Sequence, residues 1–218
     1  MVIFDCNGVL VDSEMLATQV LSEQFIRAGF ALTPEVVARH FTGLRPADIF
    51  EQVEIASGRR LPDEFGTTVR EAILARFRDE LRTTPYAAQA LSWVRGPKCV
   101  ASSSSLVRIR VTLETANLIR FFEPYLFSAA QVKRGKPAPD LFLHAAARMS
   151  VDPKTCIVVE DSPVGVSAAV AAGMRAIGFA GGSHAGSGLG DHLRSLGASA
   201  VISDMRALKT AIVDLRGW

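Results

Sequence analysis

Cysteine is scarce in this chain. Only three occur among the 218 residues: Cys6, Cys99 and Cys156 are far apart, and each lies in or next to an expected buried strand. This spacing matches neither a disulfide framework nor a zinc-binding cluster. We therefore expect a protein of the reducing cytoplasm.

Net charge and long apolar runs are lacking as well. The formal net charge is +2 and the arginines are scattered through helical patterns, so nothing favours a nucleic-acid partner. No apolar run reaches the length of a membrane span, and we expect no membrane partner. We expect no signal peptide ahead of Asp5, because the predicted site begins there, although a trimmed N-terminus would also leave so short a lead.

The order of the expected elements predicts the fold class. From residue 84 onward, strand and helix patterns alternate, which is typical of a mainly parallel sheet covered on both faces. Residues 13–83 instead predict four helices with no strand between them, as in a separate bundle. We expect an α/β fold, with a Rossmann-like three-layer core of residues 1–12 and 84–218 and an inserted α-helical cap of residues 13–83.

The expected elements of the core have the following bounds. Strands are predicted at 1–4, 98–101, 125–127, 156–159, 174–178 and 200–202. Helices are predicted at 87–94, 106–117, 138–149, 164–172 and 205–215. Residues 180–190 are rich in glycine and serine, which indicates a surface loop.

Polar residues follow several of these strands or open the next loop. Asp5 ends the first apolar strand and is followed by the turn residue Gly8. The other polar features are Ser102, Lys136 and the pair Glu160-Asp161. Because the carboxyl ends of parallel strands meet at one edge, where open α/β sheets bind ligands, all four features can converge on one site.

These four features resemble the sequence motifs of the haloacid dehalogenase superfamily, in its phosphatase and β-phosphoglucomutase-like branch. The first motif reads Phe4-Asp5-Cys6-Asn7-Gly8-Val9-Leu10-Val11-Asp12-Ser13-Glu14. It departs from that branch at Asn7, where the family has a second aspartate. Each motif is weak by itself, and the combination in this order is specific.

The resemblance implies a hydrolase of a small phosphorylated metabolite, such as a sugar phosphate. Asp5 would be the nucleophile that forms an aspartyl-phosphate, which water then hydrolyses. Lys136 would bridge Asp5 and the substrate phosphate, and Ser102 with the amide of Ser103 would hold phosphate oxygens. The expected substrate-binding residues are Asp5, Cys6, Asn7, Ser13, Gly43, Arg45, Ser102, Ser103 and Lys136.

The resemblance also implies Mg²⁺ as the cofactor, because two adjacent carboxylates would otherwise repel each other. Asp5, Asp161 and the backbone carbonyl of Asn7 would hold the ion, with Glu160 bound directly or through water. Taken singly, these residues also fit plain structural roles. Asp161 could cap a helix, a loop lysine is usually solvated, and four serines in a row could form a flexible loop.

Asn7 predicts poor turnover. The family uses an aspartate there as general acid and base, and an amide can do neither at neutral pH. This help is worth about 10²–10⁴-fold in rate. Two explanations compete: a substitution made to trap a substrate, which the other intact motifs favour slightly, and a natural divergence.

The cap is expected to set substrate choice. Thr42-Gly43-Leu44-Arg45 resembles the cap's substrate loop, and Asp12 and Ser13 lie at the expected hinge. The β-phosphoglucomutases have a histidine and an arginine at the positions of Ala17 and Pro46, which argues against a mutase. His40, His144, His184 and His192 show no ligand spacing, so we expect no catalytic role for them.

Other functions are also compatible with the sequence. A dehalogenase would lack the Glu160-Asp161 pair, and a phosphonate hydrolase would use a cap lysine, yet residues 13–82 contain none. A pseudoenzyme that binds a phosphorylated ligand without turnover is the alternative from another class. We expect a monomer.

Overall fold

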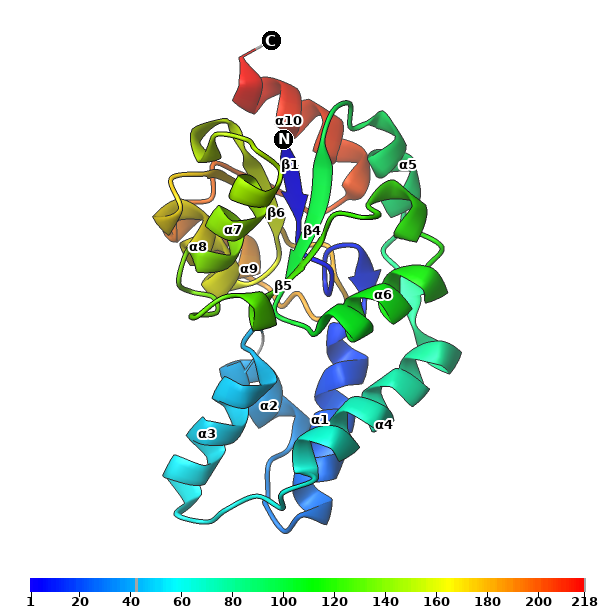
Figure 1. Cartoon of the computed structure of the whole chain (residues 1–218), viewed down its shortest axis with the longest axis vertical. Coiled ribbons are helices and arrows are strands. Elements are labelled where there is room, and N and C mark those ends of the chain that lie inside the picture. The colour runs from blue at the N-terminus through cyan, green and yellow to red at the C-terminus, as the bar shows by residue number, and fades with distance from the viewer. Residues whose placement is uncertain (42, 218) are drawn as a thin grey trace.

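The computed structural model of the chain describes residues 1–41 and 43–217 (Figure 1). Its centre is a six-stranded sheet with the order β5-β4-β1-β6-β7-β8, in which all neighbouring strands are parallel. The strands are β1 (Val2–Phe4), β4 (Lys98–Ser102), β5 (Leu126–Ser128), β6 (Ile157–Glu160), β7 (Arg175–Phe179) and β8 (Ala200–Ile202).

Side chains alternate between the two faces of each strand, so the sheet has a separate apolar core on each face. Phe4 and Val159 belong to one core, whereas Ile3 and Val158 belong to the other. The first core is covered by α5 (Ala87–Trp93), α6 (Leu106–Thr115) and α10 (Leu208–Arg216). The second is covered by α7 (Asp140–Arg148), α8 (Pro163–Ala171) and α9 (Leu189–Ser195). These three layers confirm the predicted fold class.

Four further helices pack on one another around an apolar core of their own. They are α1 (Glu14–Arg27), α2 (Pro34–Phe41), α3 (Pro46–Ser57) and α4 (Phe65–Glu80). An aromatic contact joins α1 and α4, since the ring centroids of Phe25 and Phe65 are 4.9 Å apart. Figure 1 shows these helices beyond the end of the sheet at which β1 terminates.

Two features of the fold were not predicted. The chain passes between the α1–α4 helices and the sheet through a short antiparallel pair, β2 (Val11–Asp12) and β3 (Arg82–Thr83), too brief to leave a sequence pattern. Helix α9 begins at Leu189, inside the stretch expected to be loop. The other core elements lie within a few residues of their predicted bounds. Within the described ranges, no helix is long and apolar enough to cross a membrane.

Candidate active site

Three neighbouring strands carry polar residues to the same edge of the sheet. Phe4 at the end of β1 pairs in register with Val100 of β4 and Val159 of β6. The next residue, Asp5, is therefore level with the ends of both neighbours. Parallel register thus brings Asp5, Ser102 and Glu160 together, as the strand-end argument predicts.

Lys136 reaches this edge from the loop before α7. Its Nζ lies 2.5 Å from Oδ1 of Asp5 and also donates a hydrogen bond to Oε1 of Glu160. All three side chains are buried, with exposed fractions of 6% for Asp5, 3% for Lys136 and 1% for Glu160. Burial alone would lower the pKa of Lys136, but the two carboxylates outweigh burial and raise it. The lysine is therefore held firmly in its charged form.

The pKa of the Asp5 carboxyl group is set by opposing effects. Burial raises the pKa of its carboxyl group, Lys136 lowers it, and the negative charges of Glu160 and Asp161 raise it further. Lys136 thus faces two carboxylates directly, and a third, Asp161, lies close enough to act on Asp5. A second cation beside Asp5 would offset this excess of negative charge and favour the ionised carboxylate.

The four consecutive serines are ordered by separate partners. Ser102 Oγ accepts a hydrogen bond of 3.3 Å from the backbone N–H of Ser104, and Ser105 Oγ accepts one from the N–H of Arg108 at the start of α6. Ser103 Oγ donates to the carbonyl of Gly43, between α2 and α3, at 2.9 Å. The run therefore forms a fixed turn around the strand end, and the hydroxyl of Ser103 is used for contact with the α1–α4 helices.

Asn7 faces this turn. Its Nδ2 donates to Ser104 Oγ at 2.9 Å, while its Oδ1 is buried without a hydrogen-bond partner among the described residues. Ser104 is itself fixed, because its carbonyl accepts a hydrogen bond of 2.6 Å from Ser128 Oγ. The side chain of Asn7 is thus fixed at the same sheet edge as Asp5, and its Oδ1 has no hydrogen-bond partner among the described residues.

Glu160, the last residue of β6, and Asp161, which follows it, lie in two different environments. Both oxygens of Glu160 have partners: Oε1 accepts from Lys136, and Oε2 accepts from the N–H and the hydroxyl of Ser162 at 3.0 and 2.9 Å. A Cβ at Gly165 would lie 2.0 Å from the carboxyl carbon of Glu160, so only glycine leaves room for this arrangement. Both carboxylate oxygens of Glu160 are therefore occupied by Lys136 and Ser162 in this structure.

The Asp161 side chain points away from Lys136 and toward the loop of residues 180–188, where it contacts His184. Its Oδ2 lies 2.9 Å from Nε2 of His184. Burial raises the pKa of Asp161 to about 7, although contact with His184 opposes the rise. Gly8 adopts φ +76° and passes so close that a Cβ there would lie 1.9 Å from the same oxygen. His184 was expected to have no catalytic role, and no sequence pattern predicted that it would lie beside Asp161.

A metal ion would find oxygen ligands between Asp5 and Asp161. No three His, Cys, Asp or Glu side chains within residues 1–41 and 43–217 form a ready metal-binding group. Mg²⁺ does not need one, because water, backbone carbonyls and substrate phosphate commonly complete its shell. The two aspartates, each with an oxygen free of a lysine or serine partner, and the carbonyl of Asn7 fit such an ion in donor chemistry.

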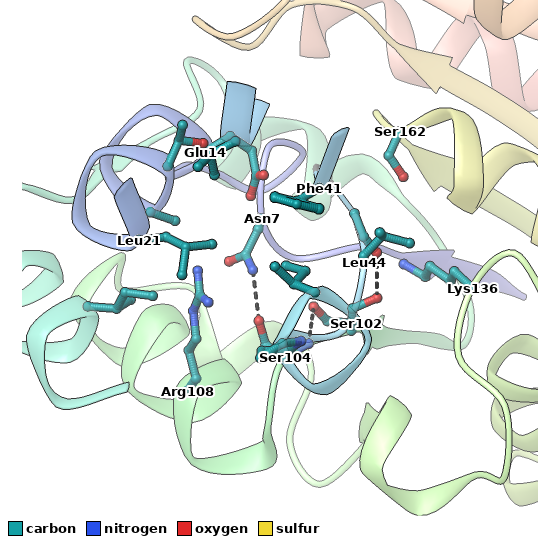
Figure 2. A pocket seen from close by; sticks show the side chains of 18 of the residues that line it. Asn7, Glu14, Leu21, Phe41, Leu44, Ser102, Ser104, Arg108, Lys136 and Ser162 are labelled. Atoms are coloured by element: carbon teal, nitrogen blue, oxygen red, sulfur yellow. Dashed lines mark hydrogen bonds between the residues drawn. The ribbon is translucent and has the colours of Figure 1, made fainter. Parts of the chain in front are cut away.

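A pocket extends from this edge toward the α1–α4 helices (Figure 2). Its polar end includes Asp5, Ser102, Ser103, Lys136 and Asp161. Its apolar wall comes from the helices and includes Leu21, Phe41, Ile49, Val69 and Ile73. Glu14 and Arg108 also line it, and neither was singled out from the sequence.

Of the cap residues expected to bind substrate, Gly43 lines the pocket and Arg45 does not. Gly43 lines the pocket and packs against Ser162. Arg45 instead pairs with Asp48 at 2.6 Å, and is not among the described pocket-lining residues. Ser13 is buried at the start of α1, with its hydroxyl unpartnered in the described chain. Thr42, from the same expected loop, lies outside the described residues.

Cys6 is also removed from the pocket. Its side chain is fully buried in the apolar core of the sheet, and burial raises the pKa of its thiol. Any contact of Cys6 with a phosphate would therefore come from its backbone.

Comparisons with known proteins show which family the chain belongs to. The chain is 34% identical over 179 residues to 6-phosphogluconate phosphatase of Escherichia coli K12, covering 82% of this chain and 81% of that protein. It is 37% identical to a haloacid dehalogenase-like protein of Agrobacterium tumefaciens, whose crystal structure superposes with a TM-score of 0.83 and coverage of 99% and 98%.

A second crystal structure, of a HAD family hydrolase from Deinococcus radiodurans with bound phosphate and sodium, is 29% identical. Its TM-score is 0.73, with coverage of 98% of this chain and 94% of that one. Residues 1–173 match the family described as haloacid dehalogenase-like hydrolases. This match confirms the resemblance read from the four motifs, and the chain belongs to the haloacid dehalogenase-like hydrolases.

Proposed function

We propose that this protein is a Mg²⁺-dependent phosphatase that hydrolyses phosphate esters of small sugars or sugar acids through an aspartyl-phosphate on Asp5. The observation that carries the proposal is the buried contact of Lys136 with Asp5, at 2.5 Å, at the base of the pocket. The relative named 6-phosphogluconate phosphatase supports the substrate class.

In the proposed reaction, a carboxylate oxygen of Asp5 attacks phosphorus, and the bond from phosphorus to the ester oxygen breaks. Water then attacks the aspartyl-phosphate, which releases inorganic phosphate and restores the carboxylate. Lys136 and the hydroxyl of Ser102 would hold the phosphoryl oxygens in both steps. Mg²⁺ held by Asp5, Asp161 and the Asn7 carbonyl would neutralise charge on those oxygens.

Asn7 limits both steps. Its Nδ2 can donate a hydrogen bond to the leaving oxygen, but it cannot deliver a proton or remove one from water. We therefore propose slow turnover for this chain and faster turnover for its Asn7→Asp variant.

We propose that residues 13–83, which include α1–α4, act as a cap over the core of residues 1–12 and 84–218. The hydrogen bond from Ser103 to the Gly43 carbonyl supports this role, because it joins the two units at the pocket. A closed cap would keep water from the reacting phosphate. The monomeric state and cytoplasmic location remain predictions.

A panel of phosphate esters, assayed for released phosphate, tests the proposal on the chain and on Asn7→Asp. We expect Asn7→Asp to hydrolyse some of them, and Asp5→Asn in the Asn7→Asp background to abolish that activity. Hydrolysis that survives Asp5→Asn contradicts the proposed nucleophile.

The second candidate is a binding protein without turnover, which Asn7 itself favours. Tight phosphate binding by an Asn7→Asp variant that stays inert on the whole panel would support this candidate. None of the described residues that line the pocket favours the dehalogenase, phosphonate-hydrolase or mutase interpretation.

A further inference from the structure

Arg108 is a cation in the pocket that the proposed phosphate chemistry does not use. It lies in the first turn of α6 and lines the pocket together with Leu21 and Asn7. Long helical side chains lean toward the helix N-terminus, so Arg108 leans back toward the sheet edge. Figure 2 shows its guanidinium between Leu21 and Asn7, with Lys136 on the far side of Asn7.

The guanidinium of Arg108 has no polar partner in the part of the chain that the structure describes. Its Nε is buried without a hydrogen bond, and no ion pair of Arg108 occurs among residues 1–41 and 43–217. Burial lowers its pKa, while Glu14 opposes the change, and an arginine stays charged at neutral pH. A buried charged donor without a partner costs free energy, which a ligand in the pocket would recover.

One contact does hold the group in place. The guanidinium carbon lies 4.9 Å from the ring centroid of Phe77, which belongs to α4. A cation–π contact supplies no hydrogen-bond acceptor, so it leaves the N–H donors of the guanidinium available. Packing on Phe77 therefore orients the guanidinium and leaves its hydrogen-bond donors without acceptors.

Glu14 is the acidic residue that most opposes the fall in the pKa of Arg108, which makes it the candidate for an internal partner. It lines the same pocket, but no ion pair within the described ranges joins it to Arg108. In contrast, Arg110 on the same helix is exposed and paired with Glu123. Arg108 is thus the arginine of α6 whose side chain is left available to a bound molecule.

We propose that Arg108 is a specificity-determining residue that binds a carboxylate carried by the substrate at the end away from the phosphate. Nε and one terminal nitrogen of a guanidinium form a planar fork that matches a carboxylate with two parallel hydrogen bonds. The inference rests on the proposed phosphatase function and narrows its substrates to phosphorylated sugar acids over neutral sugar or polyol phosphates.

Two probes that differ only at one end test this inference. Gluconate 6-phosphate carries a carboxylate where glucitol 6-phosphate carries a CH₂OH group. Rates are measured in the Asn7→Asp background, and dissociation constants with the slow Asn7 chain, for Arg108→Gln, Arg108→Lys and the control Arg110→Gln.

We expect Arg108→Gln to lower kcat/KM for gluconate 6-phosphate by about 10- to 100-fold, mainly through KM, because a charged hydrogen-bonded pair is lost. The rate for glucitol 6-phosphate should change less than about threefold. Arg108→Lys should give an intermediate loss, since it keeps the charge without the fork. Arg110→Gln should leave both substrates within about twofold.

Equal losses on the two probes would overturn the inference, because a residue that only packs on Phe77 would affect both alike. A parent protein that binds the two probes equally would also overturn it. Failure of the phosphatase proposal is distinct: no variant would release phosphate from either probe, while the ratio of the two dissociation constants would still report on Arg108.

Discussion

The ammonium group of Lys136 lies 2.5 Å from Oδ1 of Asp5, although 131 residues separate them in the chain. It also contacts Glu160, and the ring of Phe142 lies 5.1 Å from its nitrogen. The lysine thus contacts two buried carboxylates, one directly after β1 and one at the end of β6. Its position links the stability of the sheet edge to the proposed chemistry.

Replacing Lys136 by Met should therefore damage both properties. Breaking a buried ion pair leaves uncompensated carboxylates and costs about 3–5 kcal/mol, which denaturant unfolding would measure. Phosphate release by an Asn7→Asp background should fall by at least about 10²-fold, because one cation facing the phosphoryl oxygens is removed.

The double variant Lys136→Met/Glu160→Gln is the control for that prediction. It removes the Glu160 charge that Lys136→Met leaves without a cation, so it should regain part of the lost stability without regaining activity. Full stability in Lys136→Met alone would mean that the buried pair contributes nothing.

The sequence predicted those parts of the site that follow from sheet geometry. Asp5, Ser102 and Glu160 end adjacent parallel strands, so a strand pattern and a topology suffice to bring them together. Lys136 required the family resemblance as well, because a loop lysine has no periodicity that fixes its direction. The fold class followed in the same way from alternating strand and helix patterns.

Other features depend on contacts that leave no local pattern. His184 meets Asp161 only because the loop of residues 180–188 folds back over the sheet edge. The sequence does not distinguish Arg108 from the other helical arginines, because its position depends on the packing of α6 against Phe77 of α4. The serine run was ambiguous for a similar reason, since its partners, Gly43 and Asn7, are remote in sequence.

Gly8→Ala should lower activity through Asp161. The substitution places a Cβ 1.9 Å from Asp161 Oδ2 and forces alanine to adopt φ +76°. Gly58→Ala is a matched control, because Gly58 has φ +66° and nothing within 4 Å of its added Cβ. Both should lose about 1–2 kcal/mol of stability from backbone strain. Only Gly8→Ala should lose further stability and activity; equal behaviour of the two variants would contradict the close approach.

Ser104→Ala should disturb residue 7. It removes the acceptor of the Asn7 side chain and, in the Asn7→Asp background, the hydroxyl that can turn to donate to the new carboxylate. We expect a loss of about 1 kcal/mol in stability and about tenfold in rate. Ser92→Ala, which removes an exposed hydroxyl bonded to the Gln89 carbonyl, is the control and should leave the rate unchanged. An unchanged rate in Ser104→Ala would argue that residue 7 is positioned by other contacts.

The three cysteines should be unreactive in the native protein. Burial raises the pKa of each thiol, and that of Cys99 to about 12, so its thiolate fraction at pH 8 is about 10⁻⁴. Disulfide-exchange reagents at pH 8 should label no thiol before unfolding and three in denaturant. A thiol ionises near pH 8.5 in the unfolded chain, whereas the buried thiols stay protonated to higher pH. Ionisation therefore favours the unfolded chain, and the stability that the protonated buried thiols contribute is complete below about pH 8.5 and is lost as pH rises toward 12. The melting temperature should therefore fall between pH 8 and 10, and fall less in Cys99→Ala. Rapid labelling of the folded chain at pH 8 would contradict the buried placement of these thiols.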